Sequence, residues 1–289
     1  MKRLLILSGK GGTGKTTTAA AFLHFAKARA MADCDVDAPN LHLLLSRKEE
    51  PETSVFYGGD KAVIDPEKCA GCGLCQEHCR FHAIRAGKSG FEVDEFACEG
   101  CGVCQYICPA GAVQLHEDAA GTKRLYAGDT VFSTAELKMG RGNSGKLVSE
   151  VKLAMLKNAP ECELAIVDGS PGIGCPVIAS VSGMDLVLIV AEPSASGVSD
   201  LKRLLETAET FHTKVAVCVN KYDLSPAHAE EIEAFCRAQK VPFVGKIPYD
   251  KTASQAINAG KSLAEISCPA GKALKKIFEQ TMGLLEIKI

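Results

Sequence analysis

The sequence predicts an α/β protein with a doubly wound, mostly parallel sheet and a small inserted α+β module. Two observations support this fold class. Apolar, strand-like runs alternate with helical patterns over most of the chain, which is typical of parallel sheets covered by helices. Eight cysteines are concentrated in one short region. We therefore expect an α/β domain over residues 1–60 and 118–289 and an inserted module over residues 61–117.

The composition narrows the classes of partner and compartment. The chain has 289 residues and a net charge of −2, so nucleic acid and anionic membranes are not expected partners. It has no apolar run of about 18 residues, so no stable membrane insertion is expected. The first residues run directly into a glycine-rich motif that signal cleavage would destroy, so a cytoplasmic location is expected. Fourteen cysteines in a reducing compartment favour metal binding over disulfides.

The N-terminal segment reads as strand, loop and helix. An apolar run over 4–7 precedes a glycine-rich loop over 8–17, and helical spacing follows to residue 28. The loop fits the phosphate-binding pattern G-x-x-x-x-G-K-[ST], in which backbone N–H groups and a helix N-terminus receive a phosphate chain. Lys15 is then expected to reach the terminal phosphates, and the hydroxyl of Thr16 a magnesium ion. A glycine-rich turn without a ligand is the alternative, but it leaves two lysines on one loop unexplained. The expected nucleotide-binding residues of this loop are Gly9, Lys10, Gly11, Gly12, Thr13, Gly14, Lys15, Thr16 and Thr17.

The second lysine of the loop, Lys10, makes the motif unusual. The run Gly-Lys-Gly-Gly-Thr-Gly-Lys-Thr-Thr at residues 9–17 resembles the signature of the deviant-loop ATPases, which include MinD, ParA, Mrp and the nitrogenase iron protein. The resemblance implies that Lys10 crosses a dimer interface to the partner's nucleotide. It thus implies an ATP-dependent homodimer, or a heterodimer with a paralogue, and catalytic roles for Lys10 and Lys15.

After the first helix, a short strand is expected to end in the alternating residues Asp33, Asp35 and Asp37. Period-two spacing places them on one side if the strand persists. The resemblance implies that Asp35 orients the attacking water in catalysis; a turn with helix-capping aspartates is the alternative. The segment from Lys15 to Asp33 looks shorter than in the resembled family. The polar, turn-rich residues 47–60 are expected to form a linker.

The cysteine-rich region repeats one layout twice. Each half has a strand-like run, the spacing C-x2-C-x2-C-x3-C, and then a short apolar pair. This is the spacing of bacterial ferredoxins with two 4Fe–4S clusters, in which the fourth cysteine of each half ligates the other cluster. One cluster is therefore expected on Cys69, Cys72, Cys75 and Cys108, and the other on Cys98, Cys101, Cys104 and Cys79.

A pair of zinc knuckles is the alternative to the two clusters. Zinc sites usually combine C-x2-C pairs across a longer spacer, whereas each half here places four cysteines within a few residues. One departure from the ferredoxin pattern is Arg80, which follows Cys79 where proline is expected.

The α/β pattern returns after residue 121. Leu125 and Tyr126 are expected to start a weak strand, and a polar loop over 140–146 to lead into a helix over 147–158. That loop is interpreted either as a helix entry or as a second anion site. The remaining elements are expected as strands over 164–168, 185–191, 215–219 and 242–247 and helices over 199–211, 227–239 and 270–285.

The strand over 164–168 delivers Asp168 at its carboxyl end, where open α/β sheets bind their ligands. The stretch resembles the second switch of the deviant-loop family, which implies that Asp168 holds magnesium through water and that Gly172 senses the terminal phosphate. By the same resemblance, Cys175 lies at the offset of a ligand of the intersubunit cluster in the nitrogenase iron protein. A third, intersubunit cluster is one reading of Cys175, and a buried free cysteine is the other.

The C-terminal region contributes the expected base pocket. Asn220 carries both a donor and an acceptor, which suit an adenine edge, although the same form reads guanine in other nucleotide-binding proteins. The resemblance implies that Pro248, Tyr249 and Asp250 line the pocket. The helix over 270–285 is expected to pack on the sheet; a membrane-contacting tail is the alternative.

The resemblance spans nearly the whole chain and is closest to MinD-superfamily ATPases that carry an inserted ferredoxin domain. It implies a P-loop ATPase whose dimerisation cycle gates electron transfer between two 4Fe–4S clusters and a redox or metalloprotein partner. A module inserted after the first switch is placed to sense that switch. Two alternatives stay open: an iron–sulfur or metallocluster maturation ATPase, and a MinD/ParA-like positioning ATPase with redox-tuned partner binding.

Overall fold

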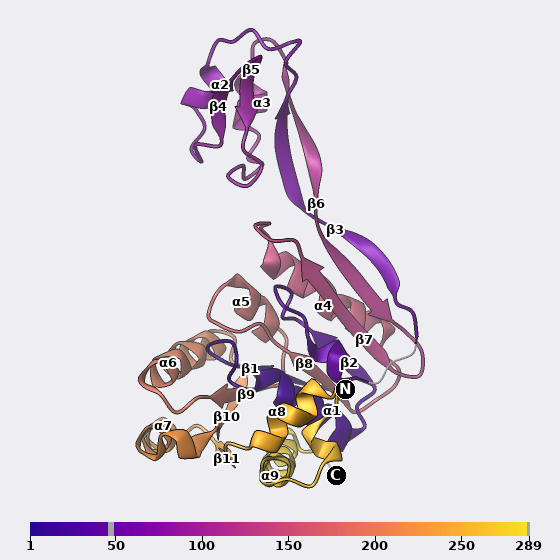
Figure 1. Ribbon diagram of the computed structural model, residues 1–289, viewed down its shortest axis with the longest axis vertical. Coiled ribbons are helices and arrows are strands. Elements are labelled where there is room, and N and C mark those ends of the chain that lie inside the picture. The colour runs from indigo at the N-terminus through magenta and orange to yellow at the C-terminus, as the bar shows by residue number, and fades with distance from the viewer. Residues whose placement is uncertain (46–48, 288–289) are drawn as a thin grey trace. The chain divides into compact units, whose positions relative to one another are not determined.

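The computed structural model of the chain describes residues 1–45 and 49–287. The chain divides into two compact units (Figure 1). Unit 1 comprises residues 1–54, 123–136 and 145–289, and unit 2 comprises residues 55–122 and 137–144. The chain passes between them inside the long strands β3 (Glu52–Ile64) and β6 (Val113–Tyr126), and again at both ends of the 137–144 segment.

The α/β domain alternates strands and helices along the chain. Its strands are β1 (Lys2–Leu7), β2 (Ala30–Asp33), β7 (Val131–Leu137), β8 (Leu164–Asp168), β9 (Leu186–Ala191), β10 (Lys214–Asn220) and β11 (Phe243–Ile247). Its α-helices are α1 (Lys15–Ala26), α4 (Ser144–Asn158), α5 (Cys175–Val181), α6 (Ala195–Thr210), α7 (Pro226–Ala238), α8 (Lys251–Asn258) and α9 (Pro269–Leu285). Short 3₁₀ turns occupy Leu41–Leu44, Tyr222–Leu224 and Leu263–Glu265.

The strands form a sheet in the order β11-β10-β9-β1-β8-β2-β7-β6-β3. The seven strands from β11 to β7 are all parallel to their neighbours. Every residue of β8 and β9 is buried, which is the pattern of parallel strands covered by helices on both faces. The expectation of a mostly parallel α/β sheet is therefore confirmed.

The core on one face of the sheet joins α1 and α9 to the central strands. Leu4 and Ile6 of β1 belong to this core, together with Phe22 of α1 and Phe278 of α9. The two phenylalanine rings meet edge to face with centroids 5.1 Å apart. Figure 1 shows α9 beside α1 and, separately, α6 beside α7. The intervening residue Leu5 is fully buried as well, so the other face of β1 is also covered.

Unit 2 folds around its own small core, and its halves repeat one backbone layout. Its elements include α2 (Leu74–Glu77), the antiparallel pair β4 (Ile84–Gly87) and β5 (Gly90–Val93), and α3 (Val103–Ile107). Several backbone bonds of the first half have counterparts in the second: the N–H groups of Cys69 and Cys98 donate to Asp65 O and Asp94 O at 3.0 and 2.9 Å. The internal duplication expected from the sequence is thus present in the backbone.

Several sequence expectations need correction. The expected linker over 47–60 is wrong for residues 52–60, which belong to β3, while residues 47 and 48 lie outside the described part of the chain. Leu125 and Tyr126 end the long strand β6 instead of starting one, and β7, α5 and α8 were not anticipated. Among the residues that the structure describes, none of the helices has both the length and the apolar character to cross a bilayer.

Candidate nucleotide site and cysteine module

Three neighbouring strands place the expected catalytic residues at one edge of the sheet. Asp168 ends β8 and lies in register with Ile6 of β1 on one side and with Asp33 of β2 on the other. The phosphate loop follows β1 directly and leads into α1, whose first residue is Lys15. The carboxyl ends of β1, β8 and β2 therefore bring the loop and both aspartates together, as open α/β sheets do at their ligand sites.

Lys15 is the centre of a buried charge cluster. Its Nζ donates to Asp168 Oδ1 at 2.7 Å and lies 3.6 Å from Asp35 Oδ2. Burial acts to lower the pKa of Lys15, but the charges of Asp168 and Asp35 outweigh it and raise that pKa, so the ammonium stays charged. Burial also raises the pKa of Asp35, against the charge of Lys15. Three residues that the sequence predicted as catalytic thus lie together in the structure.

Two buried oxygens, one in this cluster and one in the phosphate loop, bear on the ligand that the site could take. Asp168 Oδ2 and Thr13 Oγ1 are buried and have no hydrogen-bond partner among the described residues. An unpartnered buried polar atom costs about 1–3 kcal/mol, so such atoms usually have a partner that the chain itself does not supply. A free carboxylate oxygen beside the phosphate loop fits water-mediated magnesium, and the residues present therefore fit a Mg-nucleotide.

Asp33 has a different role from the other two aspartates. Its carboxylate accepts hydrogen bonds from the N–H groups of Asp35 at 3.0 Å, Asn40 at 3.1 Å and Leu41 at 3.0 Å. It therefore holds the loop that carries Asp35. β2 ends at Asp33, so the strand does not persist through the alternating aspartates. Burial, followed by the charge of Asp168, raises the pKa of Asp33 to about 7.

Lys10 is held within its own chain. Its Nζ forms an ion pair with Glu192, which follows β9, and donates to Ser196 Oγ at 3.1 Å in the first turn of α6. Neither partner was anticipated from the sequence, because both lie far along the chain and carry no motif. Lys10 is about two-fifths exposed in this pairing.

The expected base-pocket residues line one cavity with the phosphate loop. This cavity, of about 220 Å3, is bounded by Gly12, Gly14 and Thr17 and by the expected residues Asn220, Pro248, Tyr249 and Asp250. Three segments separated in sequence therefore meet at this point.

Within that cavity, Asn220 serves the phosphate loop. Its Nδ2 donates to Thr13 O at 2.7 Å and its Oδ1 accepts from the N–H of Lys221 at 2.9 Å. Gly14 has φ +95°, and a side chain there would collide with Asn220 Nδ2. Lys221 Nζ also donates to Gly12 O at 3.1 Å, a contact that the sequence did not reveal. The amide of Asn220 thus braces the loop.

The side chain of Asp250 also forms hydrogen bonds with the backbone. Its carboxylate caps α8 through Thr252 N at 2.9 Å and accepts from Ala270 N at 3.3 Å, at the start of α9. Tyr249 stays partly exposed, and its N–H donates to Asp223 at 2.7 Å. The wall of the cavity is therefore held by hydrogen bonds from backbone N–H groups.

In unit 2, the four cysteines expected to hold one cluster surround one small cavity. Its lining includes Cys79, Cys98, Cys101 and Cys104. Backbone N–H groups point at sulfurs of both halves: Ala62 N to Cys98 Sγ at 3.4 Å and Ala83 N to Cys79 Sγ at 3.4 Å. Such donors stabilise thiolates and cluster sulfurs. This arrangement fits a 4Fe–4S cluster.

The cysteines expected to hold the other cluster are Cys69, Cys72, Cys75 and Cys108. Cys69 and Cys72 lie close enough for their charges to add to the burial that raises the pKa of Cys75. Cys108 accepts from Ala112 N at 3.3 Å and packs against the small core that contains Cys98. Among the described residues, no three His, Cys, Asp or Glu side chains converge as a site for a single metal ion. A cubane presents one iron to each thiolate, so its ligands need not converge on one point.

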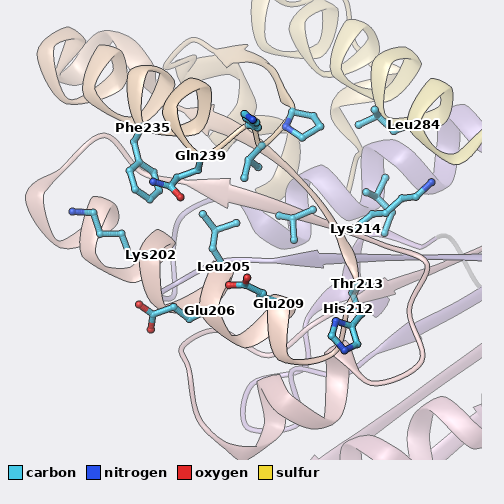
Figure 2. Close-up of a pocket in the computed structure, with 15 residues that line it drawn as sticks. Lys202, Leu205, Glu206, Glu209, His212, Thr213, Lys214, Phe235, Gln239 and Leu284 are labelled. Atoms are coloured by element: carbon cyan, nitrogen blue, oxygen red, sulfur yellow. The ribbon is translucent and has the colours of Figure 1, made fainter.

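Two further features lie outside these sites. Cys175 is exposed at the first residue of α5. A larger cavity of about 820 Å3 lies near the amino ends of β10 and β11, away from the phosphate loop. Figure 2 shows Lys202, Glu206 and Glu209 from α6 and Phe235 from α7 around it. Its lining mixes both charges with apolar side chains and includes none of the expected site residues.

Comparison with known proteins supports the nucleotide site. The family model described as the CobQ/CobB/MinD/ParA nucleotide binding domain matches residues 4–263. An uncharacterised protein of Methanocaldococcus jannaschii is 32% identical over 285 residues, covering 96% of this chain and 95% of that protein. An iron-sulfur cluster carrier protein of Pyrococcus abyssi is 24% identical over 302 residues, covering 98% of this chain and 86% of that protein. The structure of the septum site-determining protein MinD of Pyrococcus horikoshii, complexed with Mg-ADP, is similar with a TM-score of 0.60 at 16% identity. The match covers 100% of this chain and 99% of that one.

The fold and the phosphate loop together define a nucleotide-binding α/β protein of the P-loop class. Because the family model covers most of its length, the chain belongs to the CobQ/CobB/MinD/ParA nucleotide-binding family.

Proposed function

We propose that this protein is a cytoplasmic ATPase whose ATP-driven dimerisation cycle controls electron transfer through two 4Fe–4S clusters. The observation that carries this proposal is that one chain combines two complete sets of side chains. Lys15, Asp35 and Asp168 meet at the phosphate loop, and four cysteines surround a single cavity in unit 2.

Each residue of the nucleotide site has a separate role in the proposed reaction. Lys15, which pairs with Asp168, would reach the terminal phosphates, and Asp168 and the hydroxyl of Thr16 would hold magnesium. Asp35, held in its loop by Asp33, orients the attacking water. Lys10 leaves Glu192 to reach the nucleotide of a second subunit, which makes dimerisation depend on ATP.

The cysteine module would hold one cluster on Cys79, Cys98, Cys101 and Cys104, and the other on Cys69, Cys72, Cys75 and Cys108. When bound, such clusters transfer single electrons. The protein's contribution is to supply thiolates, to direct backbone N–H groups at their sulfurs, and to bury Cys75 and Cys98. A redox protein partner would supply and accept the electrons.

The proposal is tested on protein purified without oxygen. We expect about eight irons per chain, slow ATP hydrolysis, a dimer only with MgATP, and a shift in the reduction potential of the clusters when ATP replaces ADP. Lys15→Met is the matched variant: it should keep its iron and lose every response to ATP. A wild-type potential that does not change with nucleotide would overturn the coupling, even if hydrolysis were found.

A second candidate function is assembly of iron–sulfur clusters on other proteins. It is favoured by the similarity to proteins named iron-sulfur cluster carrier, of which one is 24% identical over nearly the whole chain. Under this reading the clusters are cargo. An apo-ferredoxin incubated with the holo-protein and MgATP should then gain iron. Retention of all iron by the donor would favour electron transfer instead.

A further inference from the structure

We infer that Arg141 is a positioning residue that links the second nucleotide switch to the cluster held by Cys98. The inference rests on the proposed function and adds a second structural connection between the nucleotide site and the cysteine module. The sequence suggested that the module senses the nucleotide through the first switch, on the N-terminal side of the insertion. The structure provides a second covalent connection on the C-terminal side, through the 138–144 segment.

Within unit 2, Arg141 attaches the 138–144 segment to the turn that precedes Cys98. Its Nη2 donates to Glu95 Oε2 at 2.7 Å, its Nη1 lies 3.6 Å from Asp118 Oδ1, and its guanidinium lies 5.2 Å from the centroid of the Phe96 ring. The side chain is only 13% exposed. A planar guanidinium that pairs with two carboxylates and stacks on a ring holds its neighbours more rigidly than a single surface ion pair.

The turn held by Arg141 is short and leads directly to a cluster ligand. Asp94 Oδ1 accepts from Phe96 N at 3.0 Å, and Asp94 O accepts from Cys98 N at 2.9 Å. A displacement of Glu95 and Phe96 must therefore move the backbone of Cys98. The sulfur of Cys98 also accepts from Ala62 N, so this movement changes a hydrogen bond to the thiolate.

Within unit 1, the same segment continues without a break into α4, which is fastened to α5. Lys152 Nζ donates to three carbonyls at the end of α5, those of Ala179 at 2.6 Å, Ser180 at 2.9 Å and Ser182 at 2.6 Å. At the other end of the contact, Gly145 approaches Cys175 so closely that an added Cβ would lie 3.3 Å from Cys175 O. The two ends of α5 therefore both contact α4.

The loop before α5 is the second switch, and it is bonded to the nucleotide site. Gly172 N donates to Ser8 O at 3.1 Å in the phosphate loop, and Ser170 Oγ donates to Cys34 O beside Asp33 and Asp35. A rearrangement of this loop on ATP binding pulls on α5, and α5 is fastened to α4. Because α4 begins where the 138–144 segment ends, Arg141 passes this displacement to Cys98.

The test is hydrogen exchange of the full-length, iron-loaded protein, with MgADP and with MgATP. In the wild type we expect exchange of residues 94–104 to differ between the two nucleotides. Arg141→Gln and Glu95→Ala should lose most of that difference, while Arg141→Lys should keep part of it. Arg124→Gln is the matched control, because Arg124 pairs with Glu136 at 3.2 Å within unit 1.

Each outcome has a distinct meaning. Loss of the response in Arg141→Gln and Glu95→Ala, with iron content and nucleotide binding kept, supports the inference. Full retention of the response in both variants overturns it and leaves the proposed function intact. A wild type without any response refutes the nucleotide control itself. If Arg141→Gln loses its iron, the exchange response of Glu95→Ala decides whether the inference holds. The Glu95 side chain is 57% exposed, so its removal opens no cavity.

Discussion

The Lys15 ammonium lies 2.7 Å from the Asp168 carboxylate, and both side chains are almost completely buried. In this arrangement the lysine that should bind phosphate is paired with the aspartate that should bind magnesium. The two side chains form an ion pair in a buried site, and a Mg-nucleotide would separate them. The pair explains how a site built for a highly charged ligand is stable without it.

Removing one member of this pair should destabilise the nucleotide-free protein. We expect Lys15→Met to cost about 3–5 kcal/mol in the free energy of unfolding, because it leaves a buried carboxylate without its cation. The double variant Lys15→Met/Asp168→Asn should recover a large part of that loss without recovering nucleotide binding. Urea unfolding of the four proteins of this cycle measures both effects. Additive losses would show that the two side chains do not interact.

Freeing Lys10 should favour the dimer. Glu192 holds Lys10 in its own chain, and this ion pair must break before Lys10 reaches a second subunit. For a partly exposed pair worth up to about 1 kcal/mol, Glu192→Gln should strengthen ATP-dependent dimerisation by up to about fivefold for each pair that breaks, or up to roughly thirtyfold when both subunits release Lys10. Analytical ultracentrifugation with MgATP measures the dissociation constant. Lys10→Ala, the paired control, should abolish the dimer, and a weaker dimer in Glu192→Gln would contradict the role given to the ion pair.

How far the sequence predicted this site depends on how local each feature is. The phosphate loop and both cysteine repeats are written in short, contiguous patterns, so their residues were identified directly. Asp168 was found because strand ends in parallel sheets face one ligand edge. By contrast, the bond from Asn220 to Thr13 and the pairing of Lys10 with Glu192 join residues far apart in the chain. No local periodicity encodes such side-chain partners, and Asn220 was accordingly interpreted as a base reader.

Asn220 should therefore affect all nucleotides alike. Its amide supports the backbone of the phosphate loop, so Asn220→Ala should weaken binding of MgATP and MgGTP by a similar factor. A well-formed, partly buried hydrogen bond of this kind contributes about 0.5–1.5 kcal/mol, or roughly two- to tenfold in affinity. Calorimetric titration with both nucleotides distinguishes the roles. A loss confined to ATP would return Asn220 to the role of an adenine reader.

The titration of Asp33 should make stability depend on pH. A carboxyl with a raised folded-state pKa binds more protons in the folded than in the unfolded chain between its two pKa values, so the free energy of unfolding falls as pH rises through that window. For Asp33 the window runs from about 3.9 to about 7. From about pH 6 to about pH 8, the wild type should lose stability relative to Asp33→Asn, which cannot titrate. Urea midpoints of the nucleotide-free proteins measure the difference, and a constant offset between them would be inconsistent with a raised pKa.

The fold itself was predicted better than its connections. The apolar runs of β1, β8, β9 and β10 are continuous, because parallel strands are buried on both faces. The strands β3 and β6 were largely missed, since they are rich in polar and glycine residues and look like linkers. The loop over 140–146 was interpreted as a helix entry or a second anion site, because the contacts of Arg141 come from residues on two other segments.

The pairing of cysteines between the two halves of the module can be tested by counting iron. Cys79, Cys98, Cys101 and Cys104 surround one cavity, although Cys79 belongs to the first half of the repeat. Cys79→Ala and Cys98→Ala should each leave about four of about eight irons. The double variant should also keep about four, because both residues serve the same cluster. Cys69→Ala/Cys79→Ala should lose nearly all iron. Cys162→Ser, outside the module, is the control for the loss of a thiol. If Cys79→Ala/Cys98→Ala were the variant stripped of iron, each half would hold its own cluster.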